Sequence, residues 1–355
     1  MKKKFGLVQI CRGLAALAVV GYHLNGSAND YFKCSFLGKT FLHGSLGVDF
    51  FFVLSGFIIT YVHFNDLENR SNIKQFLLKR FIRIYPIYWV FCTIFILVLI
   101  FIFHGKTDHN HLEIDSINTY GYIIANYLLV THSEDFYLVV AWTLSYEILF
   151  YFVFVTCIYA GIRKAKFIFF GWMLLVFIKM LLPDALPNTI LFHERITEFL
   201  VGCFVAYAIR EMKPFQNRFW IPSFSITIVL LFITYPIWLN NPWGTALLAI
   251  TNGLIIYKLV QVDSEKNYRY PKLLMLIGEA SYSIYLSHFL FFSVFLRIMK
   301  IVINQLNLHE TVTIQCMLII VFAFTVSAGI FIYKFLEMPM TEYLNKKFIS
   351  KNLIS

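Results

Sequence analysis

Residues 219–257 read FWIPSFSITIVLLFITYPIWLNNPWGTALLAITNGLIIY and contain no Asp, Glu, Lys, Arg or His. A single membrane crossing needs about 20 apolar residues, so a stretch of 39 residues is too long for one helix. Pro236, Asn240, Asn241 and Pro242 lie near its middle, and Pro and Asn favour turns. The stretch therefore predicts two membrane-spanning helices joined by a short turn.

The composition of the whole chain agrees with this prediction. Of the 355 residues, 59% are hydrophobic and 14% are charged, and the mean hydropathy is +0.69. Soluble domains are about half apolar and about one quarter charged, because a surface in water needs charge. The sequence therefore excludes an ordinary soluble domain and predicts an all-α integral membrane protein that has the lipid bilayer as its solvent.

Apolar windows of spanning length occur along the whole chain. They give ten predicted membrane spans, at roughly residues 6–25, 45–63, 84–104, 137–160, 166–182, 194–210, 219–239, 243–260, 272–299 and 311–336. We predict one membrane domain, residues 1–340, followed by a short cytoplasmic tail, residues 341–355. Residues 119–130 are apolar but too short to span, and we expect them to lie at the membrane interface or to re-enter the bilayer.

The formal net charge of +10 is distributed unevenly between the two sides of the membrane. One side holds both termini and the connections near residues 64–83, 161–165, 210–218 and 258–272, and it collects about 21 of the 30 Lys and Arg residues. The other side has about five. Cytoplasmic connections carry such an excess of Lys and Arg. Both termini are therefore predicted to be cytoplasmic, and the basic charge reports topology and does not indicate nucleic acid.

The six cysteines give no sign of a disulfide framework or a metal site. Five of them lie within predicted spans, namely Cys11, Cys92, Cys157, Cys203 and Cys316. No Cys-x-x-Cys pair or Cys/His spacing typical of metal ligands occurs. We predict no metal.

Two ionisable residues, Arg12 and His23, lie within the first predicted span. Ionisable groups at membrane depth are costly, and they mark functional or paired sites. The two residues are eleven positions apart, which places them on one helix face about 16 Å from each other along the axis. Arg12 then lies in the cytoplasmic half and His23 near the outer end. The alternative interpretation is a snorkelling arginine and an interfacial histidine.

The second predicted span begins near the outer face with GVDFFFVLSGF, residues 47–57. Asp49 therefore enters the membrane at about the depth of His23 on the neighbouring antiparallel helix. A carboxylate beside an imidazole fixes its tautomer and raises its basicity, which suits a general base. The alternative is that Asp49 caps the second helix at the interface.

Arg80 and Arg83 precede the third predicted span and are three residues apart, so they are neighbours on one helical face. Two guanidinium groups can bind phosphate oxygens in a bidentate manner. The alternative is that these residues only orient the protein in the membrane.

Further polar residues lie in later spans. Glu147 is deep enough in the fourth span to need a partner. Arg195 and Glu198 are expected to pair locally at the start of the sixth span, as a structural feature. In the ninth span, His288 lies in the outer half, and Tyr282 and Tyr285 are three residues apart. The Ser and Tyr hydroxyls of this span could line a polar groove or serve only as contacts between helices.

Taken together, these stretches resemble the acyltransferase-3 family of membrane O-acyltransferases. The resemblance rests, in chain order, on Arg12 and His23 as Arg-x10-His, residues 47–56 as G-V-D-x-F-F-V-L-S-G, Arg80 and Arg83 as Arg-x-x-Arg, residues 142–151 as W-S-L-x-x-E-x-x-F-Y with Thr143 where Ser is usual, residues 195–202 as R-x-x-E-F-L-x-G, residues 278–288 as G-x-x-S-Y-x-I-Y-L-x-H, and residues 337–339 as E-x-P. Seven ordered motifs that cover nearly the whole chain are far more specific than any one of them.

The resemblance implies ten spans with cytoplasmic ends, in a bacterial cytoplasmic (inner) membrane. It also implies an enzyme that transfers acetyl or another short acyl group from cytoplasmic acyl-CoA to a hydroxyl of a glycan. Such acceptors include lipopolysaccharide O-antigen and exopolysaccharide, and we expect a lipid-linked form. Some family members add a C-terminal hydrolase-like domain. This sequence ends about 15 residues after its last predicted span, which implies direct transfer or a separate partner.

These observations combine into a predicted mechanism. The phosphates of acyl-CoA are expected to bind near Arg80 and Arg83, with Arg12 reaching them from the first span. The pantetheine arm then presents the thioester to His23, which acts as a general base oriented by Asp49. A covalent acyl-histidine is the alternative. Glu147, Tyr285 and His288 are predicted to line the site or contact the acceptor.

The rival hypothesis comes from another functional class. A membrane carrier or exporter of a polysaccharide or small metabolite would use the same polar interior as a pathway. It would need neither CoA recognition nor a positioned base, so acyl transfer or thioester hydrolysis by the purified protein separates the two hypotheses. The sequence does not predict the oligomeric state.

The charge asymmetry makes a direct prediction about topology. Reporter fusions or cysteine labelling should place residues 64–83 and 344–355 in the cytoplasm and residues 105–136 outside. An external C-terminus would contradict the even number of spans and the proposed direction of acyl flow.

Overall fold

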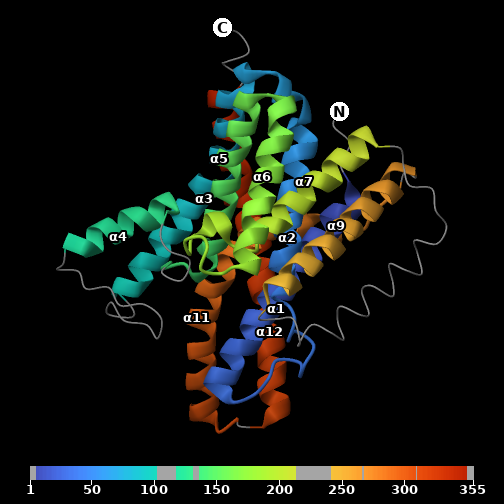
Figure 1. Cartoon of the computed structure of the whole chain (residues 1–355). Coiled ribbons are helices and arrows are strands. Elements are labelled where there is room, and N and C mark those ends of the chain that lie inside the picture. Colours follow the sequence, from blue (N-terminus) through green and yellow to red (C-terminus); the bar gives the residue numbers. More distant parts are fainter. Residues whose placement is uncertain are drawn as a thin grey trace. The chain divides into compact units, whose positions relative to one another are not determined.

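The computed structural model describes residues 5–101, 117–130, 136–212, 241–265, 268–308 and 310–349. Every secondary-structure element in these ranges is a helix (Figure 1). The chain divides into two compact units. The first contains Met1–Cys11, Val48–Leu77 and Tyr146–Tyr270, and the second contains Arg12–Gly47, Leu78–Ser145 and Pro271–Ser355.

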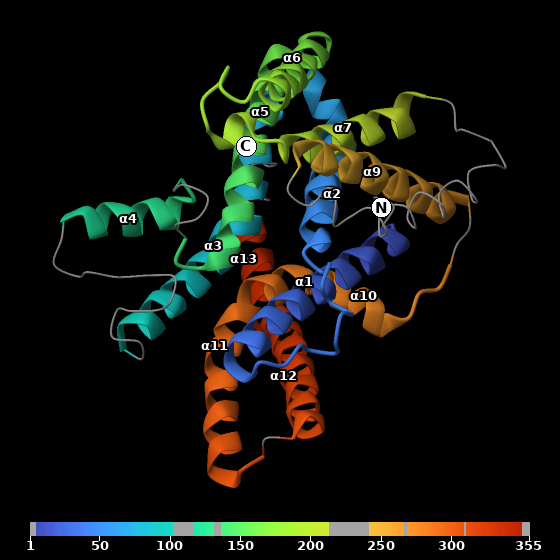
Figure 2. The same ribbon diagram turned by 60° about the horizontal axis from the view of Figure 1, so that its bottom comes forward.

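The first unit is built mainly from α2 (Leu46–His63), α5 (Trp142–Ala160), α6 (Ile162–Leu181), α7 (Ile196–Glu211) and α9 (Pro242–Glu265). Helix α7 lies along α9, as Figures 1 and 2 both show. Helices α2 and α7 approach closely where each carries a glycine. A Cβ on Gly56 would overlap the carbonyl oxygen of Phe199, and a Cβ on Gly202 would overlap that of Val53. Small residues at such contacts let helices in a membrane pack backbone to backbone.

The second unit contains most of α1 (Gly6–Phe32) and α3 (Ile73–Phe101), then α4 (Ile117–Leu128), α10 (Lys272–Glu279), α11 (Ser281–Leu306), α12 (Thr311–Ile332), the π-helical turn Tyr333–Glu337 and α13 (Met338–Phe348). Helices α11 and α12 form an antiparallel hairpin (Figures 1 and 2). Helix α11 ends at Asn307, which adopts the left-handed conformation that stops helices. Helix α1 packs on this hairpin through Val20, Leu24 and Ala28.

Seven helical segments of the described chain are long and apolar enough to cross a membrane. They are Gly6–Phe32, Leu46–Glu68, Ile73–Phe101, Val139–Ala160, Pro242–Glu265, Ser281–Leu306 and Thr311–Phe348. Helices suit this solvent because they bond all their backbone polar groups internally. The prediction of an all-α membrane protein is confirmed, whereas the count of ten spans and the side of the termini stay predictions.

The remaining predicted spans differ in how the structure describes them. Helices α6 and α7 coincide with the predicted spans 166–182 and 194–210, but α7 has only 16 residues and α6 carries several lysines and arginines. The predicted span 272–299 is divided at Ala280 into α10 and α11. The predicted span 219–239 lies outside the described residues, as do parts of the predicted outer connection 105–136 and of the tail 341–355. That residues 1–340 form one domain stays a prediction.

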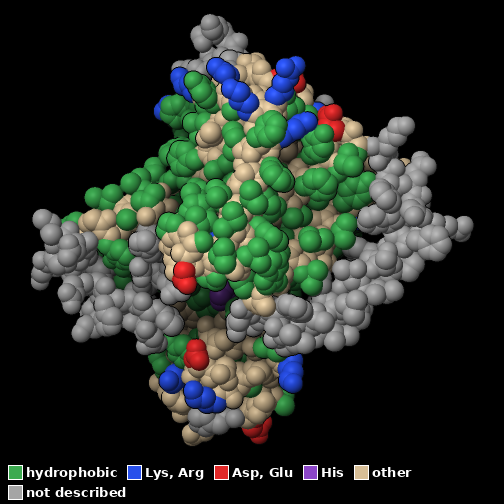
Figure 3. Space-filling view, in the orientation of Figure 1, with side chains coloured by type: hydrophobic (Ala, Val, Ile, Leu, Met, Phe, Trp, Pro, Cys, Tyr) green, Lys and Arg blue, Asp and Glu red, His purple; other side chains and the backbone are tan. Residues whose placement is uncertain are grey.

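Figure 3 shows hydrophobic side chains over the face that α5 and α6 present, with Lys and Arg side chains at the end where the two helices join. Along α6 the exposed large hydrophobic side chains are Phe167, Phe170, Leu174, Leu175, Phe177 and Leu181. All of them except Leu175 recur at intervals of three and four residues, so they form one apolar stripe. A stripe of this kind facing outward is what a lipid-facing helix requires.

Candidate functional site

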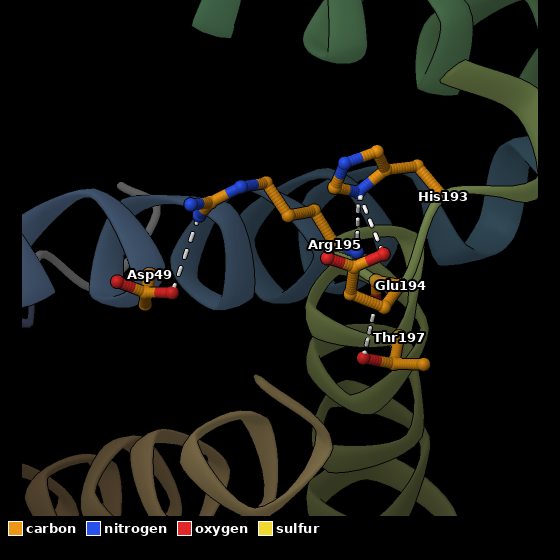
Figure 4. Close-up of polar contacts among 5 residues, drawn as sticks. All are labelled: Asp49, His193, Glu194, Arg195 and Thr197. Carbon is orange, nitrogen blue, oxygen red and sulfur yellow. Dashed lines mark hydrogen bonds and ion pairs between the residues drawn. The ribbon is translucent and has the colours of Figure 1, made fainter. Parts of the chain in front are cut away.

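The first polar centre lies in the first unit and joins α2 to α7 (Figure 4). Asp49 sits in the first turn of α2 and is buried, and Arg195 directly precedes α7. The Arg195 guanidinium Nη1 lies 3.3 Å from the Asp49 carboxylate Oδ1. Glu198, fully buried one turn into α7, also interacts electrostatically with Arg195. The predicted local pair of Arg195 and Glu198 is therefore part of a cluster of three residues with Asp49.

The side chain of His193 binds the backbone of Arg195, directly before α7. Its Nδ1 accepts a hydrogen bond from the Arg195 backbone N–H at 3.3 Å and lies 3.3 Å from the carboxylate of Glu194 (Figure 4). Burial lowers the pKa of His193, an effect that Glu194 opposes and Arg195 reinforces. A neutral ring keeps the Nδ1 lone pair available to Arg195. His193 thereby positions the residue that pairs with Asp49.

Glu147 on α5 has the partners that its predicted depth required. Its Oε1 accepts hydrogen bonds from the hydroxyl of Tyr151, one turn along α5, and from the hydroxyl of Ser55 on α2 at 3.5 Å. Both contacts lie within the first unit. They link α5 to α2 and satisfy a carboxylate that would otherwise be costly at this depth.

The second polar centre lies in the second unit and brings His23 of α1 beside His288 of α11. The two imidazole ring centres are 5.3 Å apart, and their planes differ by 30°. Phe289 packs against both rings, at 4.6 Å from His23 and 4.9 Å from His288. His23 is partly accessible, whereas His288 is fully buried. These two residues are 265 positions apart, and no spacing in the sequence predicts their contact.

The hydroxyl of Tyr285, which was predicted to line the site, is engaged within the fold. It lies 3.1 Å from the hydroxyl of Thr143 and donates to the backbone carbonyl of Val140 at 3.2 Å. The backbone carbonyl of Tyr285 lies 2.6 Å from Nδ1 of His288. Tyr285 therefore supports His288 through its main chain, while its side chain ties α11 to the segment that precedes α5.

The predicted phosphate-binding arginines lie on two helices of the second unit, Arg12 on α1 and Arg80 with Arg83 on α3. Arg83 is exposed, but Arg80 is only 9% exposed. Arg12 and Arg83 both interact electrostatically with Glu337. Thus two of the three predicted arginines share a carboxylate, and Arg80 is less accessible than its neighbour one turn away.

Glu337 is a residue of this site to which the sequence analysis gave no role. It ends the π-helical turn Tyr333–Glu337, and its Oε2 accepts a hydrogen bond from the hydroxyl of Ser283 at 2.5 Å. π-Helical turns are rare and occur frequently at functional sites. The signal present in the sequence was the Glu-x-Pro motif at residues 337–339.

The predicted site residues are thus divided between the two units. Asp49 and Glu147 belong to the first unit, and the others, Arg12, His23, Arg80, Arg83, Tyr285 and His288, belong to the second. The role of Asp49 as a partner of His23 stays a prediction. Within the described ranges, no three His, Cys, Asp or Glu side chains are grouped as metal ligands would be.

Comparison with known proteins identifies related sequences. Residues 8–334 match the acyltransferase-3 family, described as an acyltransferase domain. The chain is 25% identical to the peptidoglycan O-acetyltransferase OatA of Listeria monocytogenes, over 78% of this chain and 48% of that protein, so it spans about half the length of this relative. It is 28% identical to a putative acetyltransferase, ORF330, of Acidianus two-tailed virus, over 79% of this chain and 81% of that protein. No solved structure matches.

The cluster of Asp49, Arg195 and Glu198 predicts a stability effect. Arg195→Gln should lower the free energy of unfolding in detergent by about 2–3 kcal/mol, because it leaves two buried carboxylates facing each other without a cation. The double variant Asp49→Asn/Arg195→Gln should be less destabilised than the sum of the two single variants, and reversible unfolding measures this coupling.

Arg210→Gln is the matched control for this cycle. It removes the same charge from the other end of α7, where the guanidinium binds the carbonyl oxygen of Tyr61 and the side chain of Asn65 at an exposed position. An exposed contact of this type should contribute about 1 kcal/mol or less. Equal losses for Arg195→Gln and Arg210→Gln, or strictly additive losses in the cycle, would contradict the interpretation.

Proposed function

The chain belongs to the acyltransferase-3 family, and from that premise we propose that it is a membrane O-acyltransferase. The proposed donor is acyl-CoA, with acetyl-CoA as the first to test. The proposed acceptor is a hydroxyl of a cell-surface glycan, in keeping with the name of the Listeria relative.

One observation carries the proposal, namely the position of His23. His23 is partly accessible, and its ring lies against those of His288 and Phe289, so a base is held beside an aromatic side chain. Imidazole is the side chain best matched to proton transfer near neutral pH. A carrier has no need for a base of this kind, and the described residues offer no feature that favours the exporter hypothesis over transfer.

The proposed reaction is a direct transfer. His23 takes the proton of the acceptor hydroxyl while the hydroxyl oxygen attacks the thioester carbonyl carbon. A C–O bond forms, the C–S bond breaks, and the CoA thiolate leaves. The thiolate then takes the proton from the His23 imidazolium, which restores the neutral base. The products are an O-acyl ester and the CoA thiol, and no other reactant is needed.

The proposed donor site uses the arginines of the second unit. Arg12 lies about 16 Å from His23 along α1, a distance that an extended pantetheine arm can bridge. Arg83 is exposed on α3 and shares Glu337 with Arg12. Phosphate groups are stronger partners for guanidinium than a single carboxylate, so a CoA phosphate can replace Glu337 as the counter-charge.

The base can be tested by substitution. With a surface-glycan acceptor present, His23→Ala should reduce release of CoA from acetyl-CoA by the purified protein about 10²–10⁴-fold, the usual contribution of a general base. Binding of acetyl-CoA should persist, since the phosphate contacts are remote. In cells, the wild-type gene should restore an O-acyl group that its deletion removes from the surface glycan, as measured by mass spectrometry and NMR, and the His23→Ala gene should not.

His63→Gln is the matched control for this substitution. It removes an imidazole that contacts Asp66 at the end of α2 and that has no part in the proposed transfer, and should retain nearly the wild-type rate. A correctly inserted His23→Ala protein with the wild-type rate would refute the role of His23.

The donor site makes a separate prediction. Arg83→Ala should raise the KM for acetyl-CoA about tenfold or more and leave the turnover number nearly unchanged, because it removes a charge-assisted contact to the donor only. Lys74→Ala removes the same charge from an exposed position at the start of α3 and serves as the control. Equal KM values for the two variants would mean that Arg83 only orients the chain in the membrane.

A further inference from the structure

The hydrogen bond between His288 and Tyr285 fixes the tautomer of the His288 ring. Nδ1 of His288 lies 2.6 Å from the backbone carbonyl oxygen of Tyr285. A carbonyl oxygen only accepts hydrogen bonds, so Nδ1 must carry the proton. In the neutral ring, Nε2 is then an unprotonated acceptor.

This acceptor lacks a partner in the described structure. Nε2 of His288 is buried and has no hydrogen bond, and the side chain as a whole is fully buried. An unsatisfied polar atom at such a position is unfavourable, and a native structure explains it by a functional role, by strain or by a bound water or ion. The fixed lone pair therefore indicates a donor that reaches it in the working enzyme.

The rings that surround His288 limit which group can be that hydrogen-bond donor. Its other ring neighbours are Phe289, Phe292 and Tyr285, at centre-to-centre distances of 4.9, 5.6 and 5.9 Å. Phenylalanine has no donor, and the Tyr285 hydroxyl is bound to Val140 and Thr143. Among the described rings that contact His288, His23 is the one with an N–H to give.

The separation of the two imidazoles suits a bond between them. Two rings joined by an N–H···N hydrogen bond have centres roughly 5 Å apart, given a nitrogen–nitrogen distance of about 2.9–3.0 Å. The observed separation is 5.3 Å, and the planes differ by 30°. The torsion that turns an imidazole about its Cβ–Cγ bond is soft, so a rotation of the accessible His23 ring can bring an N–H to Nε2 of His288.

We propose that His288 is the positioning residue of the catalytic base: its Nε2 accepts the N–H of His23 and so fixes which His23 nitrogen is free to act. The inference rests on the proposed function. The proposed chain of hydrogen bonds runs from the Tyr285 carbonyl to the His288 ring, then to the His23 ring and finally to the acceptor hydroxyl. When His23 gains the hydroxyl proton, its imidazolium keeps a charge-assisted bond to His288, which stabilises the cation in an apolar setting.

Two amide substitutions separate this role from a purely structural one. The terminal amide of His288→Gln reaches about as far as Nε2 and can offer an acceptor to His23. The amide of His288→Asn reaches only as far as Nδ1 and can keep the bond to the Tyr285 carbonyl. If His288 positions His23, the His288→Gln variant should retain activity. If His288 only supports the fold through Tyr285, the His288→Asn variant should retain it instead.

The test uses the full-length protein in lipid nanodiscs and follows release of CoA from acetyl-CoA in the presence of the surface glycan from cells that lack the gene. We expect His288→Asn to lower the turnover number about 10–100-fold, the effect of losing one buried hydrogen bond to a reacting group. His288→Gln should stay within about tenfold of the wild type. Neither variant should change the KM for acetyl-CoA. Wild-type turnover for Asn, or a folded Gln variant as slow as Asn, would overturn the proposal.

A second measurement does not depend on activity or on the variants. Nitrogen NMR shifts of histidine-labelled wild-type protein report which ring nitrogen carries the proton, and His288 is expected to have a protonated Nδ1 and an unprotonated Nε2. The opposite tautomer would overturn the proposal whatever the rates are. A wild-type protein that releases no CoA with the glycan acceptor present, while His288 has the expected tautomer, would refute the proposed function on which this inference rests.

Discussion

A polar side chain inside an apolar protein in a membrane must find its partner within the protein, because lipid offers none. This constraint accounts for the polar contacts of both units. Asp49 is matched by Arg195, Glu147 by Tyr151 and Ser55, and Glu337 by Ser283. Each partner lies on another helix or one helical turn away, so the polar residues also determine which helices meet.

The same constraint applies to the proposed catalytic centre. The side chains just described have partners, but Nε2 of the fully buried His288 does not. The carbonyl oxygen of Tyr285 binds the other ring nitrogen, Nδ1, so the direction of the Nε2 lone pair is fixed. Next to it, His23 is partly accessible, and the two ring centres are 5.3 Å apart. In the proposed arrangement, the imidazole of His288 orients the imidazole of His23.

Glycines allow α1 to pack closely against its neighbours in the second unit. A Cβ on Gly47 would overlap the carbonyl region of Ala15, and a Cβ on Gly13 would crowd the backbone of Gly278. Both contacts hold α1, the helix of Arg12 and His23, against other parts of the second unit. Gly47 lies in the motif that suggested the family, and close packing against α1 gives a physical reason for glycine there. In this way the packing of α1 determines the position and rotation of the two predicted site residues that it carries.

The helices could be predicted from the sequence, because an apolar run of sufficient length has few other stable forms in a bilayer. The partners of polar residues could not, since hydropathy gives a residue's depth but not the rotation or the neighbours of its helix. Asp49 and Arg195 are 146 positions apart, and the local spacing of Arg195 and Glu198 suggested only part of that cluster. His23 and His288 were both candidates, yet their contact arises from the packing of α1 on α11. The division between α10 and α11 at Ala280 could not be predicted either, because hydropathy averaged over about 20 residues does not resolve it.

The central claim is that an acyl group leaves a CoA thioester and becomes an ester on a glycan. It is tested most directly with everted membrane vesicles, which expose the cytoplasmic face to acetyl-CoA labelled in the acetyl group. The account predicts label in the glycan fraction that mild alkali releases, as it does esters, and only when the vesicles contain this protein. Label that stays on CoA, or that enters the glycan equally in vesicles without the protein, would contradict it.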